Sequence, residues 1–133
     1  MGARTSEELR QAMEFLMEQL KNRGEEATHL TIKRVQSLVQ EFYQTGITLD
    51  EIAAKLNLTS EYLGTKFHRE MGITFSTYIK NLRMKKAKEL LIGTDLKLYE
   101  IAQKVGYANP KYFSRVFKEE TGQLPADYRR THK

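Results

Sequence analysis

The chain has 133 residues, of which 40% are hydrophobic and 29% charged, a length that fits one globular domain or two very small ones. It has no cysteine, which excludes disulfides, a thiolate nucleophile and a sulfur-ligated zinc site, and permits a reducing compartment. No apolar run approaches the roughly 20 residues that cross a bilayer, and no secretory signal is seen near the N-terminus. We therefore expect a soluble, cytoplasmic protein without a membrane partner.

The net charge of +5 is distributed unevenly along the chain. Residues 1–27 hold four Lys/Arg and six Glu, residues 28–74 hold five basic and five acidic residues, and residues 75–133 hold thirteen basic and six acidic residues. A basic C-terminal half is what a polyanion-binding surface requires. The same excess occurs on surfaces that only keep a protein soluble, so charge alone does not decide the function.

An N-terminal helix is predicted from the capping box at residues 5–8 to about Asn22, before Gly24, with residues 25–28 as a connector. Its main apolar residues follow a 4-3-4 spacing and fall on one side of the helix: Leu9, Met13, Leu16 and Leu20. Two heptads are short for a coiled coil, so we expect this helix to pack against its own domain. The alternative is a homodimer through this helix or through a further domain.

Seven more helices are predicted at about 31–44, 49–56, 60–72, 75–92, 98–105, 110–122 and 125–130. Thr48 and Thr74 are expected to cap two of them, and Asn109 followed by Pro110 is expected to cap a third. No segment alternates polar and apolar residues over the length of a strand. The predicted fold class is therefore all-α.

An internal repeat predicts how these helices are arranged. The pattern of residues 49–60 recurs 49 positions later in the chain. After a one-residue insertion the match continues 50 positions later, through Tyr62/Tyr112, Phe67/Phe117 and Gly72/Gly122. Each copy is a short helix, a tight turn and a second helix, which is the helix-turn-helix plan. We predict two such units, at about 31–74 and 97–130, joined by a long linker helix over 75–92 and preceded by the extra N-terminal helix.

The second helix of each copy has an apolar inner side and a polar outer side. In the second copy Phe113, Val116 and Phe117 are expected to face the core, with Tyr112 beside them, and the outer side is Lys111, Ser114, Arg115 and Lys118. A helix of this kind can place donors on base edges in the major groove of DNA, where arginine suits guanine.

In the first copy the inner side is predicted to be Tyr62, Leu63, Phe67 and Met71, and the outer side Glu61, Gly64, Thr65 and His68, which is far less cationic. A helix-turn-helix can also serve only as a packing motif. Two copies with a basic second half favour DNA binding.

From Gly46 to Arg130 the chain resembles the DNA-binding domain of AraC/XylS-type regulators. The second half carries the resemblance through Glu100, Ile101, Ala102, Val105, Gly106, Tyr107, Tyr112, Phe113, Ser114, Arg115, Phe117, Lys118, Gly122, Pro125, Tyr128 and Arg129. The first half matches at Leu63, Phe67, Gly72, Tyr78, Arg83, Ala87, Leu90 and Leu91. The resemblance implies that residues 28–133 form such a domain, with residues 1–27 as a connector helix.

It also implies a function, namely sequence-specific binding of double-stranded DNA in successive major grooves and regulation of bacterial transcription, most often as an activator that works with RNA polymerase. The base-contacting residues implied are Glu61, Gly64, Thr65, Lys111, Ser114 and Arg115. Basic residues expected to contact phosphates are Lys66, Arg69, Arg83, Lys85, Lys86, Lys97 and Lys118. Lys66 aligns with Val116, so we expect its side chain to extend outwards or reach a phosphate.

Other classes of function find less support in the sequence. His29, His68 and His132 are scattered and have no carboxylate at metal-ligand spacing, and no glycine-rich phosphate loop is present. We therefore expect no enzymatic activity, no metal and no cofactor. The competing hypothesis is a helical adaptor that binds polymerase or another regulator without reading DNA bases.

Overall fold

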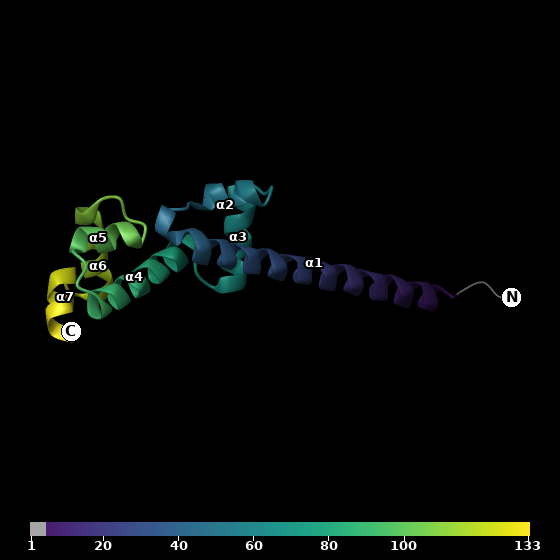
Figure 1. Ribbon diagram of the computed structural model, residues 1–133. Helices are drawn as coiled ribbons and strands as arrows, with labels where there is room; N and C mark the ends of the chain where they lie inside the picture. The colour runs from purple at the N-terminus through teal and green to yellow at the C-terminus, as the bar shows by residue number, and fades with distance from the viewer. Residues whose placement is uncertain (1–4) are drawn as a thin grey trace.

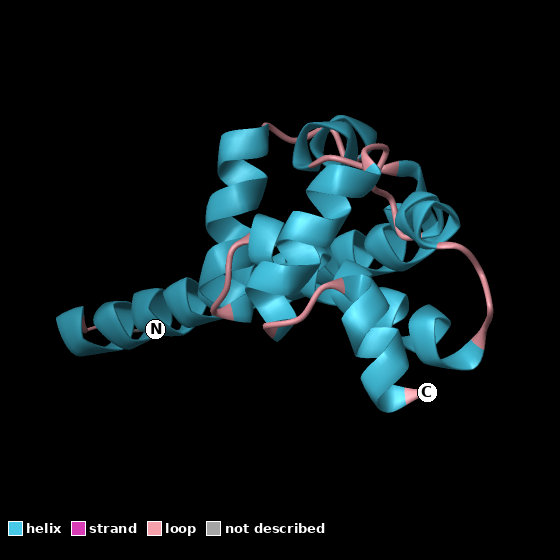
Figure 2. Cartoon of the chain, turned by 90° about the vertical axis from the view of Figure 1, so that its left-hand side faces the viewer, coloured by secondary structure: helices cyan, strands magenta, loops and turns pink. Residues whose placement is uncertain are grey.

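The computed structural model describes residues 5–133, so residues 1–4 of the predicted connector helix lie outside the described part. Over that part the chain forms only helices and loops (Figures 1 and 2). In chain order they are α1 (Ser6–Phe42), the 3₁₀ helix η1 (Tyr43–Thr45), α2 (Leu49–Lys55), α3 (Ser60–Met71), α4 (Phe75–Gly93), α5 (Leu98–Lys104), α6 (Pro110–Thr121) and α7 (Pro125–His132). The predicted all-α class is confirmed.

The first helix is longer than the sequence indicated. Helix α1 is continuous over 37 residues, so the connector predicted at residues 25–28 is wrong. A single glycine such as Gly24 costs a helix only about 1 kcal/mol relative to alanine. No proline occurs between residues 25 and 42 to end the helix. The two threonines nearby also remain compatible with the helix, because the hydroxyls of Thr28 and Thr31 donate to the carbonyls of Gly24 and Ala27 one turn earlier, at 2.9 Å each. The capping box at Thr5 and Glu8 is present as predicted.

The N-terminal half of α1 does not pack against its own domain, which corrects the second expectation for this segment. It projects away from the rest of the molecule (Figure 1). Its apolar side chains are largely exposed, from 52% at Leu9 to 67% at Met17. Burial in α1 begins only at Ile32 and continues at Val35 and Val39. The expectation was wrong because a spacing of three and four shows that a helix has an apolar side, and does not show what covers it.

The internal repeat is confirmed by the lengths of the elements. Helices α2 and α5 have 7 residues each, and α3 and α6 have 12 residues each. Thr48, Thr59, Thr74 and Asn109 each accept a backbone N–H at the start of a helix, as capping residues do. Lys97, which matches Thr48 in the second copy, is the N-cap of α5 and makes no side-chain capping bond.

Each helix-turn-helix unit has its own hydrophobic core, and α4 belongs to both. The first core includes Phe75 and Ile79 from the beginning of α4, together with Val35, Val39, Ile52, Leu63 and Phe67. The second core includes Met84, Ala87 and Leu91 from the rest of α4, together with Ile101, Val105, Phe113 and Phe117. Helix α7 closes the second unit, where Arg129 donates to the carbonyls of Leu91 and Thr94 at 3.0 and 3.2 Å. The linker is therefore a structural member of both units.

The two units also touch directly, at what we call the junction: Tyr43, Gly46, Arg83, Gly106 and Tyr107. Gly106 has a φ of 101°, and a Cβ at this position would overlap the carbonyl oxygen of Tyr43 and lie 3.0 Å from Nε of Arg83. The guanidinium of Arg83 lies 5.4 Å from the centre of the Tyr107 ring. Only glycine fits here, both because of its φ and because the backbones of the two units approach so closely.

The junction predicts that two glycine substitutions will differ in their effect. Gly106→Ala should lower the free energy of unfolding more than Gly122→Ala does, by about 1–3 kcal/mol. Both positions have positive φ, 101° and 82°, but a Cβ at Gly122 meets nothing within 4 Å. Urea unfolding of the two variants measures the difference. Equal losses would mean that the contact with Tyr43 contributes nothing.

The uncapped start of α5 predicts a stabilising substitution. Lys97 has the extended backbone of an N-cap, with φ −70° and ψ 153°, so threonine can take its place without strain. Lys97→Thr should raise the free energy of unfolding by about 1 kcal/mol. Lys97→Ala is the matched control, because it removes the same charge and adds no acceptor. The prediction fails if thermal unfolding gives the two variants the same stability.

Candidate nucleic-acid interface

The candidate interface consists of the outer sides of α3 and α6, the second helices of the two units. Their inner sides are fixed by side chains with no solvent exposure, Leu63 and Phe67 in α3 and Phe113 and Phe117 in α6. Because helical side chains project at about 100° per residue, burial of these positions forces the opposite side outwards. The backbone and the two cores therefore determine which residues each helix presents.

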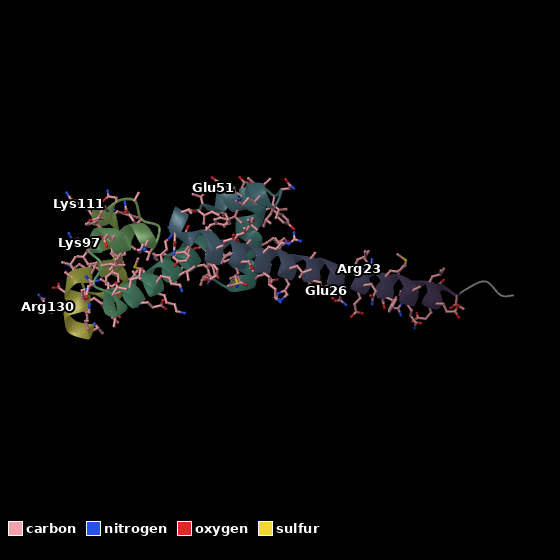
Figure 3. All side chains as sticks on the ribbon, viewed as in Figure 1. Arg23, Glu26, Glu51, Lys97, Lys111 and Arg130 are labelled. Carbon is pink, nitrogen blue, oxygen red and sulfur yellow. The ribbon has the colours of Figure 1, made fainter. Side chains whose placement is uncertain are left out.

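The outer side of α6 is cationic, as predicted. Lys111, Arg115 and Lys118 are exposed and Ser114 is half-buried. These four residues line a shallow groove beside α5, together with Leu98, Tyr99, Pro110 and Leu124. Lys97 and Lys111 lie on the same unit (Figure 3). Helix α6 thus offers three exposed cations along one groove.

The outer side of α3 has a different character. Glu61 and Thr65 are exposed, whereas Gly64 is half-buried where α3 crosses α2. A Cβ on Gly64 would lie 3.3 Å from Cδ2 of Leu49, so the small residue allows the two helices to approach closely. Arg69 is exposed near the end of the helix, and Lys66 is half-buried.

One pair of residues in this surface was misassigned from the sequence. Tyr62 was predicted on the inner side, but it is 49% exposed, and its repeat partner Tyr112 is 47% exposed. Each ring supports a cation, with Nζ of Lys66 at 5.5 Å from the Tyr62 ring centre and the Arg115 guanidinium at 5.2 Å from that of Tyr112. A cation over an aromatic face at such a site gains about 0.5–1 kcal/mol. The spacing from tyrosine to the basic residue, four in one copy and three in the other, is the sequence signal that could have revealed this.

The remaining predicted phosphate contacts differ in exposure. Lys85 and Lys97 are exposed, and Lys86 is half-buried with Nζ 3.8 Å from a carboxylate oxygen of Glu89. Arg83 lies instead at the junction, where its Nε is buried without a hydrogen-bond partner. Within residues 5–133 no carboxylate lies within ion-pair distance of Arg83.

Two further ionisable groups lie beside Arg83. Burial raises the pKa of Tyr107, and the neighbouring Arg83 only partly offsets that rise, so the phenol stays neutral and leaves the arginine charge uncompensated. Lys80 of α4 forms an ion pair with Glu120 of α6 at 2.9 Å, and this hydrogen bond raises the pKa of Lys80. The junction therefore retains one free positive charge, and an ion pair beside it ties α4 to α6.

Within residues 5–133, no three His, Asp or Glu side chains cluster in a way that could hold a metal ion. None of the helices over this range is both long enough and apolar enough to cross a bilayer.

The geometry defines a double helix-turn-helix domain, and comparison with known proteins agrees. A family model described as "Helix-turn-helix domain" matches residues 52–131. The chain is 39% identical over 92 residues to the HTH-type transcriptional regulator YtdP of Bacillus subtilis. The matched stretch covers 69% of this chain and 12% of that protein. The C-terminal domain of AraT, a response regulator from Geobacillus stearothermophilus, superimposes with a TM-score of 0.74 at 38% identity, covering 76% of this chain and 84% of that one.

A third likeness concerns the fold alone. The DNA-binding domain of the transcriptional factor AdpA, solved in complex with a target DNA, has a TM-score of 0.71 at 21% identity and covers 75% of this chain and 90% of that one. The chain spans 12% to 37% of the length of the curated relatives it matches. It belongs to the AraC-type family of helix-turn-helix transcriptional regulators.

Proposed function

We propose that this chain binds double-stranded DNA sequence-specifically, with α3 and α6 in successive major grooves. The proposal rests on one observation. Two equivalent helix-turn-helix units are held in one fixed relation by a shared helix and a direct junction. Helix α4 has 19 residues and so a length of about 28 Å, which suits units placed one turn of DNA apart. The residues proposed to contact bases are Glu61, Gly64, Thr65, Lys111, Ser114 and Arg115.

Within this proposal, Arg115 is the principal base-reading residue. Among the six proposed base contacts it is the only arginine, and arginine makes the commonest specific contact, a bidentate one to guanine. The Tyr112 ring supports its guanidinium, which lowers the conformational freedom that binding would otherwise remove. Gly64, which has no side chain, can contribute only its backbone and the space that it leaves.

Affinity is proposed to come from phosphate contacts, mostly in the second half of the chain, because the positive excess lies there. The side chains proposed for this role are Lys66, Arg69, Lys85, Lys86, Lys97 and Lys118. We leave Arg83 out of this set because its Nε is buried at the junction. Its uncompensated charge still adds to the positive potential that attracts a duplex.

The biological role proposed is activation of transcription in the bacterial cytoplasm, in contact with RNA polymerase. The complex of the AdpA domain with its target DNA supports duplex DNA as the ligand of this fold. A helical adaptor that does not read bases is the competing function, and the cationic groove along α6 disfavours it. The two functions differ in a simple measurement, because an adaptor would select no sequence from a random duplex pool.

Footprinting on a sequence selected from such a pool tests the architecture. Protection is expected in two adjacent major grooves on one side of the duplex, with centres about 34 Å apart if the DNA bends little. This follows from the fixed relation of the two units. Protection confined to a single groove would show that only one unit engages DNA.

Binding by Arg115→Ala tests the base-reading residue. On the selected sequence the variant should lose about 1–3 kcal/mol of binding free energy, because a bidentate contact to guanine disappears. On a duplex in which the contacted guanine is replaced, the parent and the variant should bind equally. If the variant keeps the full preference of the parent for guanine, Arg115 is not the residue that contacts this base.

Lys118→Ala is the matched control on the same helix. It should weaken binding to every duplex by about the same factor, because phosphates carry no base identity. It should also reduce the slope of log affinity against log salt concentration by about 0.9.

A further inference from the structure

The largest set of exposed apolar side chains lies on the N-terminal half of α1, away from the proposed DNA-binding surface. We call Leu9, Met13, Leu16 and Leu20 the α1 stripe. These side chains are 52%, 63%, 60% and 66% exposed. Arg23 interrupts the same side of the helix, which then continues through Ala27 and Leu30. A monomeric protein seldom exposes so continuous an apolar surface unless a partner covers it.

The free half of α1 also needs a partner for its own stability. Residues 6–27 extend about 33 Å and contact no other element over most of that length (Figure 1). Most of the stability of a helix in a protein comes from packing of its apolar side, which this segment lacks, and Gly24 weakens it further. A second helix against the stripe would supply the burial that the segment lacks.

The stripe is placed so that another helix can reach it. At about 100° per residue, its centre lies roughly 100° around the helix axis from Ile32, Val35 and Val39, which pack into the first unit. A partner helix can therefore lie along the stripe without meeting that unit. Arg23 and Glu26 mark this free part of the helix in Figure 3.

We propose that the α1 stripe binds the same stripe of a second copy of this chain, in a parallel, in-register coiled coil. The stripe has the spacing of three and four that a two-stranded seam requires, and like residues then form its layers. Four layers are few for a coiled coil, so we expect a weak dimer that forms only at raised protein concentration. The positions that flank the seam over residues 9–20 are Arg10, Ala12, Met17 and Gln19. Arg10 already pairs with Glu7 and Glu14 of its own helix, so no like charges oppose a second copy over residues 9–20. Arg23 would face Arg23 of the second copy, and we expect both long side chains to extend into solvent there.

The flanking residues favour the parallel orientation. In a parallel pair Ala12 of one helix lies beside Met17 of the other, which extends the apolar contact. An antiparallel pair would instead place Met17 beside Arg10. A parallel pair also brings both DNA-binding domains to the same end. Nucleic acid is not a suitable occupant, because residues 5–27 contain six glutamates and only Arg10, Lys21 and Arg23 as bases.

A matched pair of substitutions tests whether the stripe is the contact. Leu16 and Phe15 are adjacent and similarly exposed, 60% and 62%, but Phe15 lies off the stripe. Sedimentation equilibrium without DNA should show a concentration-dependent dimer for the parent and for Phe15→Asp. For Leu16→Asp the dissociation constant should rise on the order of a hundredfold, because two buried leucines are lost per dimer. Cooperative thermal unfolding, followed by circular dichroism, checks that the helix-turn-helix units stay folded in both variants.

The absence of cysteine from the chain allows a clean test of orientation. Arg23→Cys should form a disulfide-linked dimer under mild oxidation, since in-register seam positions meet the distance that a disulfide needs. In an antiparallel pair that matches residue 9 with residue 20, the two introduced thiols would be about 26 Å apart and could not join. A mixture of Ser6→Cys with Arg23→Cys would then cross-link instead.

Two results would overturn the proposal. One is a parent chain that stays monomeric up to its solubility limit, and the other is cross-linking that occurs only in the mixed sample. Neither measurement contains DNA, so the outcome is independent of the proposed DNA-binding function.

Discussion

The close contact between the carbonyl of Tyr43 and Gly106 limits how the two helix-turn-helix units can be placed relative to each other. Helix α4 contributes side chains to both cores and so already relates the two units. The junction adds a contact of backbone against backbone, where no side chain can adapt. The ion pair between Lys80 and Glu120 adds a second tie, which is half-exposed and so contributes little free energy by itself. Close packing therefore sets the geometry that the proposed DNA-reading surface requires.

The two copies of the repeat differ at the turn residue that forms the junction in the second copy. Asn57 and Gly106 occupy the same place in the turn between the two helices of each unit, and both have positive φ, 57° and 101°. Asparagine tolerates that region, and Asn57 is exposed, so the first copy needs only the conformation. The second copy needs the conformation and the missing Cβ as well. The two copies thus share a backbone and have diverged where one of them meets its neighbour.

Most of the fold follows from short-range signals, which is why it could be predicted. Caps such as Thr48 and Asn109, the equal element lengths and the buried faces of α3 and α6 all depend on residues a few positions apart. The errors concern features that depend on distant parts of the chain. The N-terminal half of α1 stays uncovered because no other element lies against it (Figure 1), and Tyr62 points outwards because Leu63 and Phe67 already fill the core. The outer residues of α6 were predicted because its amphipathic pattern is strong, whereas their contacts with bases depend on a ligand.

The unbroken course of α1 gives the molecule a mechanical property. Its last turns lie in the core of the first unit, and the 3₁₀ helix that follows carries Tyr43 to the junction. When a second helix covers its free half, α1 becomes a stiff arm about 33 Å long that ends in the core of the first unit. A dimer formed at the far end of α1 would therefore hold the first unit of each copy at a set distance from the dimer contact, while both units stay free to face DNA.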